Sequence, residues 1–272
     1  MNKNDMKLPF LSIVTVCLNS EKTIRKTIES VLNQSYRRFE YILIDGGSQD
    51  STVDILKEYE IIFINKKIRF TWKSEKDQGI YDGMNKGIEL TNGVIIGIIN
   101  GDDYYETDAF EKIHKAYLNH PDGDIFYGFM KVLMGKEELA VYRYNYDFFL
   151  LNLQSGVFTS AQHSSCFVKR SVYGEIGKFD LSFRISADYD FLVRAACKRK
   201  KFIALDHVLA NFSRGGANDQ MSEYERFNQR YRIWRKNGLV DETEYAKLVR
   251  QTRYTRLKQI KSGIVRKLFG FH

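Results

Sequence analysis

Short apolar runs alternate with amphipathic segments along the first hundred residues. An uninterrupted apolar run of about four to eight residues is typical of a strand that is buried on both faces. The runs that predict strands in this way are 11–18, 40–45, 61–64 with 69–72, and 94–99. Between them apolar residues recur every three or four positions, as at Ile24, Ile28 and Val31, which predicts a helix in each interval. Strands that alternate with helices imply a mainly parallel, doubly wound α/β sheet with helices on both faces.

The second half of the chain has a less regular pattern. Its expected elements are strands at 124–134 and 138–144 about a Gly-Lys turn, a strand, short helix and Gly-ended turn within 164–180, a helix and a strand within 187–206, and helices within 219–237 and 241–268. We therefore expect one α/β domain over residues 1–215, with halves at 9–103 and 104–215. A helical extension over residues 216–272 is expected to follow it.

Polar residues follow three of the predicted strands at the point where each strand ends. Asn19 follows the first strand, Asp45 ends the second and opens a turn up to Ser48, and residues 100–103 follow the strand at 94–99. Ligands of open α/β sheets bind beyond the carboxyl ends of the strands. These polar residues are therefore expected to meet at one binding site.

The adjacent carboxylates Asp102 and Asp103 have two interpretations. They are either an exposed acidic turn before a helix that Thr107 or Asp108 caps, or the ligands of a hard cation. Mg²⁺ and Mn²⁺ bind carboxylate oxygens, and such a cation would neutralise charge on a diphosphate leaving group.

Other acidic candidates also have structural alternatives. Asp45 either ends an ordinary Asp-Gly-Gly turn or accepts hydrogen bonds from a base or ribose. Asp77 either caps the helix that follows it or belongs to the site. Asp188 and Asp190 precede an apolar helical face, so each either caps that helix or serves as a general base.

Two basic candidates lie in the second half. His163 begins a predicted strand and is either a structural histidine or a contact to a diphosphate or an acceptor. Arg214 is followed by two glycines, which indicates either a surface turn or a loop that closes on phosphate.

Composition and charge narrow the class of protein. The 272 residues are 43% hydrophobic with two prolines, as in a compact globular chain, and three widely spaced cysteines favour a reducing compartment. No signal peptide and no apolar stretch of about 20 residues is visible, so a cytoplasmic location is expected.

The net charge is +8, but the segment after Glu244 has no acid and eight basic residues, which leaves 34 basic and 34 acidic residues elsewhere. A nucleic-acid-binding body is therefore not expected. The basic tail is either a helix packed on the domain or a peripheral attachment to anionic lipid.

Together the segments 11–52, 74–103, 163–180 and 187–195 resemble glycosyltransferase family 2. Their motifs occur in the order of the family, over roughly residues 9–215. The resemblance implies a GT-A fold over residues 1–215, with nucleotide-binding and acceptor halves, and an inverting nucleotide-sugar transferase. It also implies roles for individual residues. Those expected to line and close the nucleotide pocket are Val16 (through its backbone), Asn19, Asp45, Asp77, Gly79 and Asn85.

The remaining roles implied by the resemblance concern charge and proton transfer. Asp103 is expected to bind Mn²⁺ or Mg²⁺ directly, and Asp102 is expected to contact the ribose or the sugar. Asp188 is expected to be the catalytic base, with Asp190 as the second choice.

The expected activity is transfer of a hexose or N-acetylhexosamine from a nucleotide-sugar, with UDP as the first choice of nucleotide. The expected acceptor is a saccharide or a lipid-linked saccharide of cell-envelope polysaccharide synthesis, at the cytoplasmic face of the membrane. A sugar-1-phosphate nucleotidyltransferase is an alternative, although the Gly-rich basic loop typical of that class does not follow the first strand. A non-catalytic adaptor at the membrane surface is another.

Overall fold

The computed structural model describes residues 10–135, 137–143, 163–214, 223–241 and 243. The chain forms two compact units, Met1–Asp219 and Gln220–His272, and each is treated by itself. The elements of the first unit are β1 (Leu11–Cys17), α1 (Ile24–Leu32), β2 (Phe39–Asp45), α2 (Thr52–Asn65), β3 (Arg69–Ser74), α3 (Ile80–Glu89), β4 (Ile95–Asn100), β5 (Tyr104–Tyr105), α4 (Ala109–Asn119), β6 (Ile125–Met134), β7 (Glu137–Tyr142), η1 (His163–Ser165), β8 (Cys166–Lys169), α6 (Arg170–Ile176), α7 (Ala187–Cys197) and β9 (Phe202–Ser213).

The first four long strands form the parallel half of a nine-stranded sheet. The order of the sheet is β3-β2-β1-β4-β8-β6-β9-β5, and β7 pairs with β6 outside this path. Every residue of β1 and β2 is buried, as their uninterrupted apolar runs predict. From β8 onward the sheet is mixed, because β8 is antiparallel to both of its neighbours while β6 and β9 are parallel. The predicted α/β architecture is thus confirmed.

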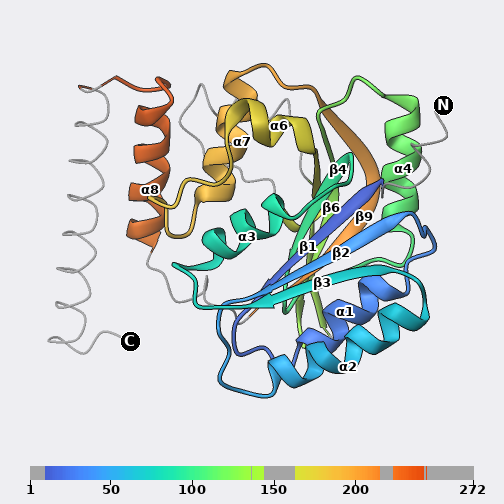
Figure 1. The fold of residues 1–272 in the computed structure, drawn as a ribbon. Helices are drawn as coiled ribbons and strands as arrows, with labels where there is room; N and C mark the ends of the chain where they lie inside the picture. The colour runs from blue at the N-terminus through green and yellow to red at the C-terminus, as the bar shows by residue number, and fades with distance from the viewer. Residues whose placement is uncertain (1–9, 136, 144–162, 215–222, 242, 244–272) are drawn as a thin grey trace, which may run out of the picture. The chain divides into compact units, whose positions relative to one another are not determined.

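Helices cover both faces of the parallel half (Figure 1). Ile24 and Ile28 of α1 belong to the same apolar core as Ile13 of β1. On the other face α3 lies so close to β1 that a Cβ atom at Gly87 would stand 2.3 Å from Cγ1 of Val14. Glycine at that position lets the helix reach the sheet and brings its first turn to the strand ends.

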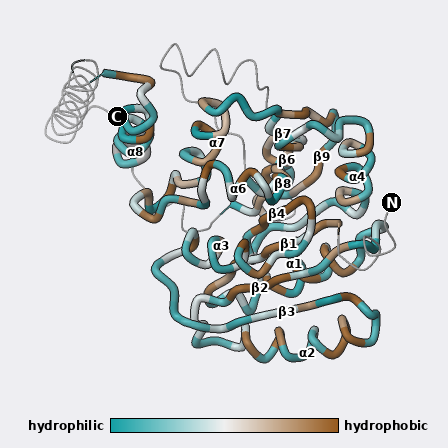
Figure 2. Tube along the Cα trace, turned by 45° about the horizontal axis from the view of Figure 1, so that its top comes forward, coloured by the Kyte–Doolittle hydropathy of each residue, from teal (hydrophilic) through white to brown (hydrophobic). Residues whose placement is uncertain are grey.

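The prediction of a strand over 61–64 is wrong. These residues lie in the last turns of α2, where Phe63 is buried but Ile61 and Ile64 are 64% and 66% exposed. The alternation of hydrophobic and hydrophilic residues along α2 is visible in Figure 2. The third strand, β3, begins only at Arg69.

The second unit contains α8 (Glu223–Lys236), the described part of the helix predicted over 219–237. Most of the helix predicted over 241–268, and with it the basic tail, lies outside the described residues. Within the described parts of the chain, no helix is both long and apolar enough to cross a membrane.

Candidate functional site

The carboxyl ends of the four parallel strands lie at one edge of the sheet. The register pairs Cys17 with Asp45, Asp45 with Ser74, and Val16 with Asn100. The carbonyl of Val16 also accepts a hydrogen bond from the amide of Gly101 at 2.9 Å. The structure therefore brings together the three polar clusters that the sequence placed at strand ends.

Asp45 is fully buried beneath the loop that follows β2. Its carboxylate accepts hydrogen bonds from the amide of Ser48 at 2.9 Å and from the hydroxyl of Ser74 at 2.6 Å. The Ser48 hydroxyl, the Gly47 amide and, at 3.6 Å, the Cys17 thiol also donate to it. With 0% exposure and five donors, Asp45 fixes the shape of the loop and has no oxygen open to solvent.

Asn19 holds the same loop from the end of β1. It has a positive φ of 49°, a conformation that asparagine tolerates better than most residues. Its amide N–H donates to the Ser48 hydroxyl at 2.7 Å, and its side-chain oxygen accepts from the amide of Gln49 at 2.9 Å. The exposed side chain of Asn19 therefore lies at the rim of this cluster.

Asp77 and Gly79 lie beside the loop, at the start of α3. The Asp77 carboxylate accepts from the amide of Gly79 at 2.9 Å. It also packs so closely on Gly46 that a Cβ atom there would stand 2.7 Å from Oδ2 of Asp77. Gly79 has φ 119°, a value that side chains disfavour.

Asn85 does not join this cluster. Its side-chain amide donates to the carbonyl of Phe179 at 2.9 Å, and its oxygen accepts from the Phe179 amide at 3.0 Å. Both polar atoms of Asn85 are thus engaged in tying α3 to the loop before α7.

The two adjacent carboxylates after β4 have different surroundings. Asp103 is 0% exposed, and its oxygens accept hydrogen bonds from the Ser213 amide and the Ser164 hydroxyl, both at 3.0 Å. Burial, together with the charge of Asp102, raises the pKa of Asp103 to about 7. Asp102 is only partly buried, and that burial raises its pKa. Neither residue caps the next helix, because β5 intervenes and Asp108 occupies the N-cap position of α4.

Of the two adjacent carboxylates, that of Asp102 is the one that is only partly buried and could bind a cation. Among the described residues there is no group of three or more His, Cys, Asp or Glu side chains that could hold a metal ion by themselves. Mg²⁺ typically binds one or two protein carboxylates together with phosphate and water, and a cation would also offset the two adjacent negative charges. The residues present therefore fit a hard cation, and of the two carboxylates only that of Asp103 is fully buried.

Asp188 and Asp190 occupy the first turn of α7 but differ in access. Asp190 is 0% exposed and is paired with Arg194 at 2.7 Å, so it is part of the packing of α7. The side chain of Asp188 is 19% exposed and accepts a hydrogen bond from the Tyr81 hydroxyl at 2.8 Å. Its Oδ2 atom lies 3.4 Å from Nδ1 of His163. Of these two carboxylates, only that of Asp188 has an exposed part.

The pKa of Asp188 reflects opposing effects. Burial alone would raise it, but the contacts with His163 and Tyr81 favour the ionised carboxylate. The net result is a pKa below the ordinary value of an aspartate.

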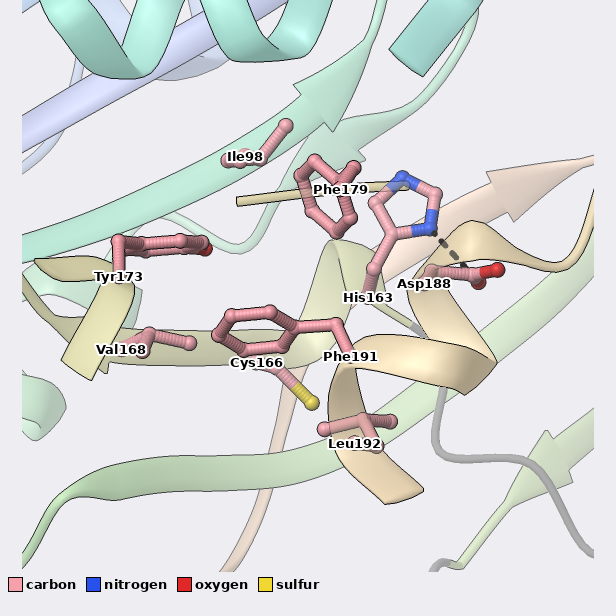
Figure 3. A pocket seen from close by; sticks show the side chains of 9 residues that line it. All are labelled: Ile98, His163, Cys166, Val168, Tyr173, Phe179, Asp188, Phe191 and Leu192. Carbon is pink, nitrogen blue, oxygen red and sulfur yellow. Dashed lines mark ion pairs between the residues drawn. The ribbon is translucent and has the colours of Figure 1, made fainter. Parts of the chain in front are cut away.

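His163 and Asp188 lie at the polar end of a pocket that is otherwise apolar (Figure 3). Its empty space, including the part open to solvent, is about 310 Å³, and Tyr173, Phe179 and Phe191 line it.

Arg214 is exposed, and its amide donates to the carbonyl of Leu133 at 2.9 Å. The two glycines after it lie outside the described residues.

Several participating residues were not predicted from the sequence. Tyr81, Ser164 and Ser213 act on carboxylates that lie 61 to 110 positions away along the chain. No local pattern of residues signals contacts of that length.

Comparisons with known proteins show the family and the fold of this chain. The family described as "Glycosyl transferase family 2" matches residues 12–177. A "PGL/p-HBAD biosynthesis glycosyltransferase" found in Mycobacterium bovis and Mycobacterium tuberculosis is 32% identical over 190 residues, which are 70% of each chain.

Two solved structures show the same fold. Staphylococcus aureus TarS 1–349 in complex with UDP-GlcNAc matches with a TM-score of 0.67 and 16% identity, over 89% of this chain and 71% of that one. The mannosyltransferase PcManGT from Pyrobaculum calidifontis, in complex with GDP-Man and Mn²⁺, matches with a TM-score of 0.62 and 15% identity, over 86% and 66%. From the family match and the shared fold together, we conclude that the chain belongs to glycosyltransferase family 2 and is an enzyme of the GT-A fold.

Proposed function

We propose that the chain transfers a sugar from a nucleotide diphosphate-sugar to an acceptor hydroxyl, with inversion at the anomeric carbon. The observation that carries this proposal is a chain of contacts from Asp188 through His163 to Asn100. It connects the accessible carboxylate of α7 to the strand end that bears Asp102. The proposed base, Asp188, and the carboxylate proposed to face the diphosphate, Asp102, thus lie at one edge of the sheet.

The donor is proposed to bind over the loops that follow β1, β2 and β3. Asn19 and the loop shaped by Asp45 would form one wall of the nucleotide pocket, with the Val16 backbone at its base and Asp77 and Gly79 closing it. UDP is the proposed nucleotide. The UDP-GlcNAc complex of the similar TarS structure supports this choice, and the GDP-Man complex of PcManGT makes GDP the alternative to test.

Asp188 is proposed to act as the general base. Because its pKa is lowered, the carboxylate is ionised at neutral pH and can accept the proton of the acceptor hydroxyl. As the acceptor oxygen forms its bond to the anomeric carbon, the bond from that carbon to the diphosphate oxygen breaks on the opposite face. The departing diphosphate develops negative charge that needs stabilisation.

A divalent cation, Mn²⁺ or Mg²⁺, would supply that stabilisation when bound at Asp102. Asp103 would then hold the turn in place from below rather than bind the cation itself. Asp102→Asn should abolish the rise in melting temperature that Mn²⁺ and UDP together produce in the wild-type protein, because the open carboxylate is lost. An undiminished rise in the variant would contradict this division of roles.

The acceptor is proposed to be a hydroxyl of a saccharide or a lipid-linked saccharide in cell-envelope synthesis. The name of the mycobacterial relatives, which refers to PGL/p-HBAD biosynthesis, supports this class. The basic extension over 216–272 is proposed to hold the enzyme at the cytoplasmic face of the membrane. Truncation after Glu244 should reduce pelleting with anionic liposomes, and unchanged pelleting would refute that role.

The test of the activity is release of nucleoside diphosphate from UDP-, GDP- and dTDP-sugars in the presence of Mn²⁺ and candidate saccharide acceptors. Acceptor-dependent release from one donor class, with product of inverted anomeric configuration by NMR, would support the proposal. A product of retained configuration would overturn the single-displacement mechanism.

A further inference from the structure

His163 joins the carboxylate of Asp188 to the end of β4. It is the first residue of η1, and its side chain is 17% exposed. Its Nδ1 atom lies 3.4 Å from Oδ2 of Asp188, the contact drawn as a dashed line in Figure 3. Its Nε2 atom lies 3.3 Å from Oδ1 of Asn100. Both ring nitrogens therefore face oxygen atoms of side chains that come from different elements.

The partners of Asn100 determine which of its amide atoms faces the ring. The Nδ2 group of Asn100 donates to Oδ2 of Asp103 at 3.4 Å, and in its ionised form the Asp103 carboxylate can only accept. The opposite atom, Oδ1, is therefore directed at His163, where it can only accept as well. An ionised Asp188 is likewise an acceptor, so each ring nitrogen meets an acceptor and each must carry a hydrogen to bond.

We propose that His163 is a positioning residue, whose doubly protonated ring holds the Asp188 carboxylate ionised and oriented toward the strand end of β4. This role rests on the proposed function, in which Asp188 is the base. The Tyr81 hydroxyl of α3, which also contacts the carbonyl of Ile185, lies 2.8 Å from the other oxygen of the same carboxylate. Two groups from separate elements thus restrain the base, and only one of them, His163, carries charge.

The electrostatic surroundings of His163 agree with a protonated ring. Burial by itself would lower its pKa, but the hydrogen bond and charge of Asp188, with the charges of Asp103 and Asp102, raise the pKa above 6.5. These acids reach the ring from two sides, Asp188 from α7 and the other two from the turn after β4. The uncharged hydroxyl of Tyr81 contacts the other oxygen of Asp188, Oδ1.

NMR of ¹⁵N-labelled histidine tests the protonation state without any assay of activity. The chain has five histidines, and the signal of His163 is the one that His163→Gln removes. At about pH 6.5 its ring should be mainly in the doubly protonated form, and Asp188→Asn should lower its pKa because the carboxylate is lost. A neutral ring at that pH, or a pKa unchanged by Asp188→Asn, would overturn the proposal.

Two near-isosteric substitutions separate the two contacts of the ring. The amide nitrogen of His163→Asn lies near the position of Nδ1 and keeps a donor to Asp188, whereas that of His163→Gln lies near Nε2 and keeps the donor to Asn100. His163→Gln should lower kcat about 100-fold with the donor KM changed less than about twofold, because a misplaced base costs about that much. His163→Asn should lose about tenfold less. The exposed His207 provides the control, and His207→Gln should leave both constants unchanged.

The pH profile distinguishes a positioning role from a purely structural one. Without the imidazolium the pKa of Asp188 should rise, so the acid limb of kcat/KM should move to higher pH in His163→Gln. An unmoved acid limb, or a donor KM that rises as much as kcat falls, would show that His163 only supports the fold. If the wild-type protein transfers no sugar, the proposed function fails, and the NMR titration still decides the state of His163.

Discussion

In the absence of a bound cation, Asp103 should make the folded protein less stable as the pH rises. Its folded-state pKa of about 7 lies above the ordinary value of 3.8, so between these values the folded state binds more protons than the unfolded state. The stabilisation by the protonated form is therefore fully present below about pH 4 and is lost as the pH rises through 7. At about 1.4 kcal/mol per pKa unit, protonation of Asp103 contributes about 4 kcal/mol to the free energy of unfolding.

Asp103→Asn isolates this contribution. The variant keeps the shape of the side chain, and both the Ser164 hydroxyl and the Asn100 amide can turn to suit its NH₂ group. Between about pH 5 and pH 8 the wild-type free energy of unfolding should fall by about 3 kcal/mol more than that of the variant. Urea titrations followed by circular dichroism at the two pH values, with EDTA present, measure the difference. An equal change in both proteins would refute the claim that burial holds Asp103 partly protonated.

Two further predictions concern the close contact between Gly46 and Asp77 and the buried hydroxyl of Tyr105. Gly46→Ala should displace Asp77 and weaken nucleotide binding about tenfold by calorimetry, while Gly174→Ala, where a Cβ atom meets nothing within 4 Å, should leave binding unchanged. Equal affinities of the two variants would contradict a role for that contact. The buried hydroxyl of Tyr105 has no hydrogen-bond partner in the described part of the chain, so Tyr105→Phe should raise the free energy of unfolding by about 1 kcal/mol. Tyr41→Phe, which loses a bond to a threonine hydroxyl at 2.9 Å, should lower it by about as much, and a loss in both variants would count against the unsatisfied hydroxyl.

The sequence predicted those parts of the fold that depend on local pattern. Buried strands such as β1 and β2 are apolar on both faces, so their limits and the polar residues at their ends could be located from the sequence alone. The run at 61–64 was misleading because Ile61 and Ile64 are exposed at the end of a helix, and an apolar run is ambiguous when burial is unknown.

The location of the candidate site could be predicted from the sequence, but the surroundings of its individual residues could not. Asp102 and Asp103 are adjacent, yet one is open and the other is fully buried, because groups more than 60 positions away fix the second. The choice between Asp188 and Asp190 depends in the same way on which side of α7 meets the pocket. Such differences arise from tertiary contacts, which residue spacing does not encode.

The most direct test of the proposed chemistry is the effect of Asp188→Asn on transfer and on binding. A general base contributes about 10²- to 10⁴-fold, so the variant should lose at least about 100-fold in kcat. Its affinity for the nucleoside diphosphate with Mn²⁺, measured by calorimetry, should stay within about twofold, because no proposed nucleotide contact involves Asp188. Asp206→Asn, at an exposed position of β9, should behave as the wild type. Transfer at the wild-type rate by Asp188→Asn, or an equal loss of transfer and nucleotide affinity, would contradict the assignment of Asp188 as the base.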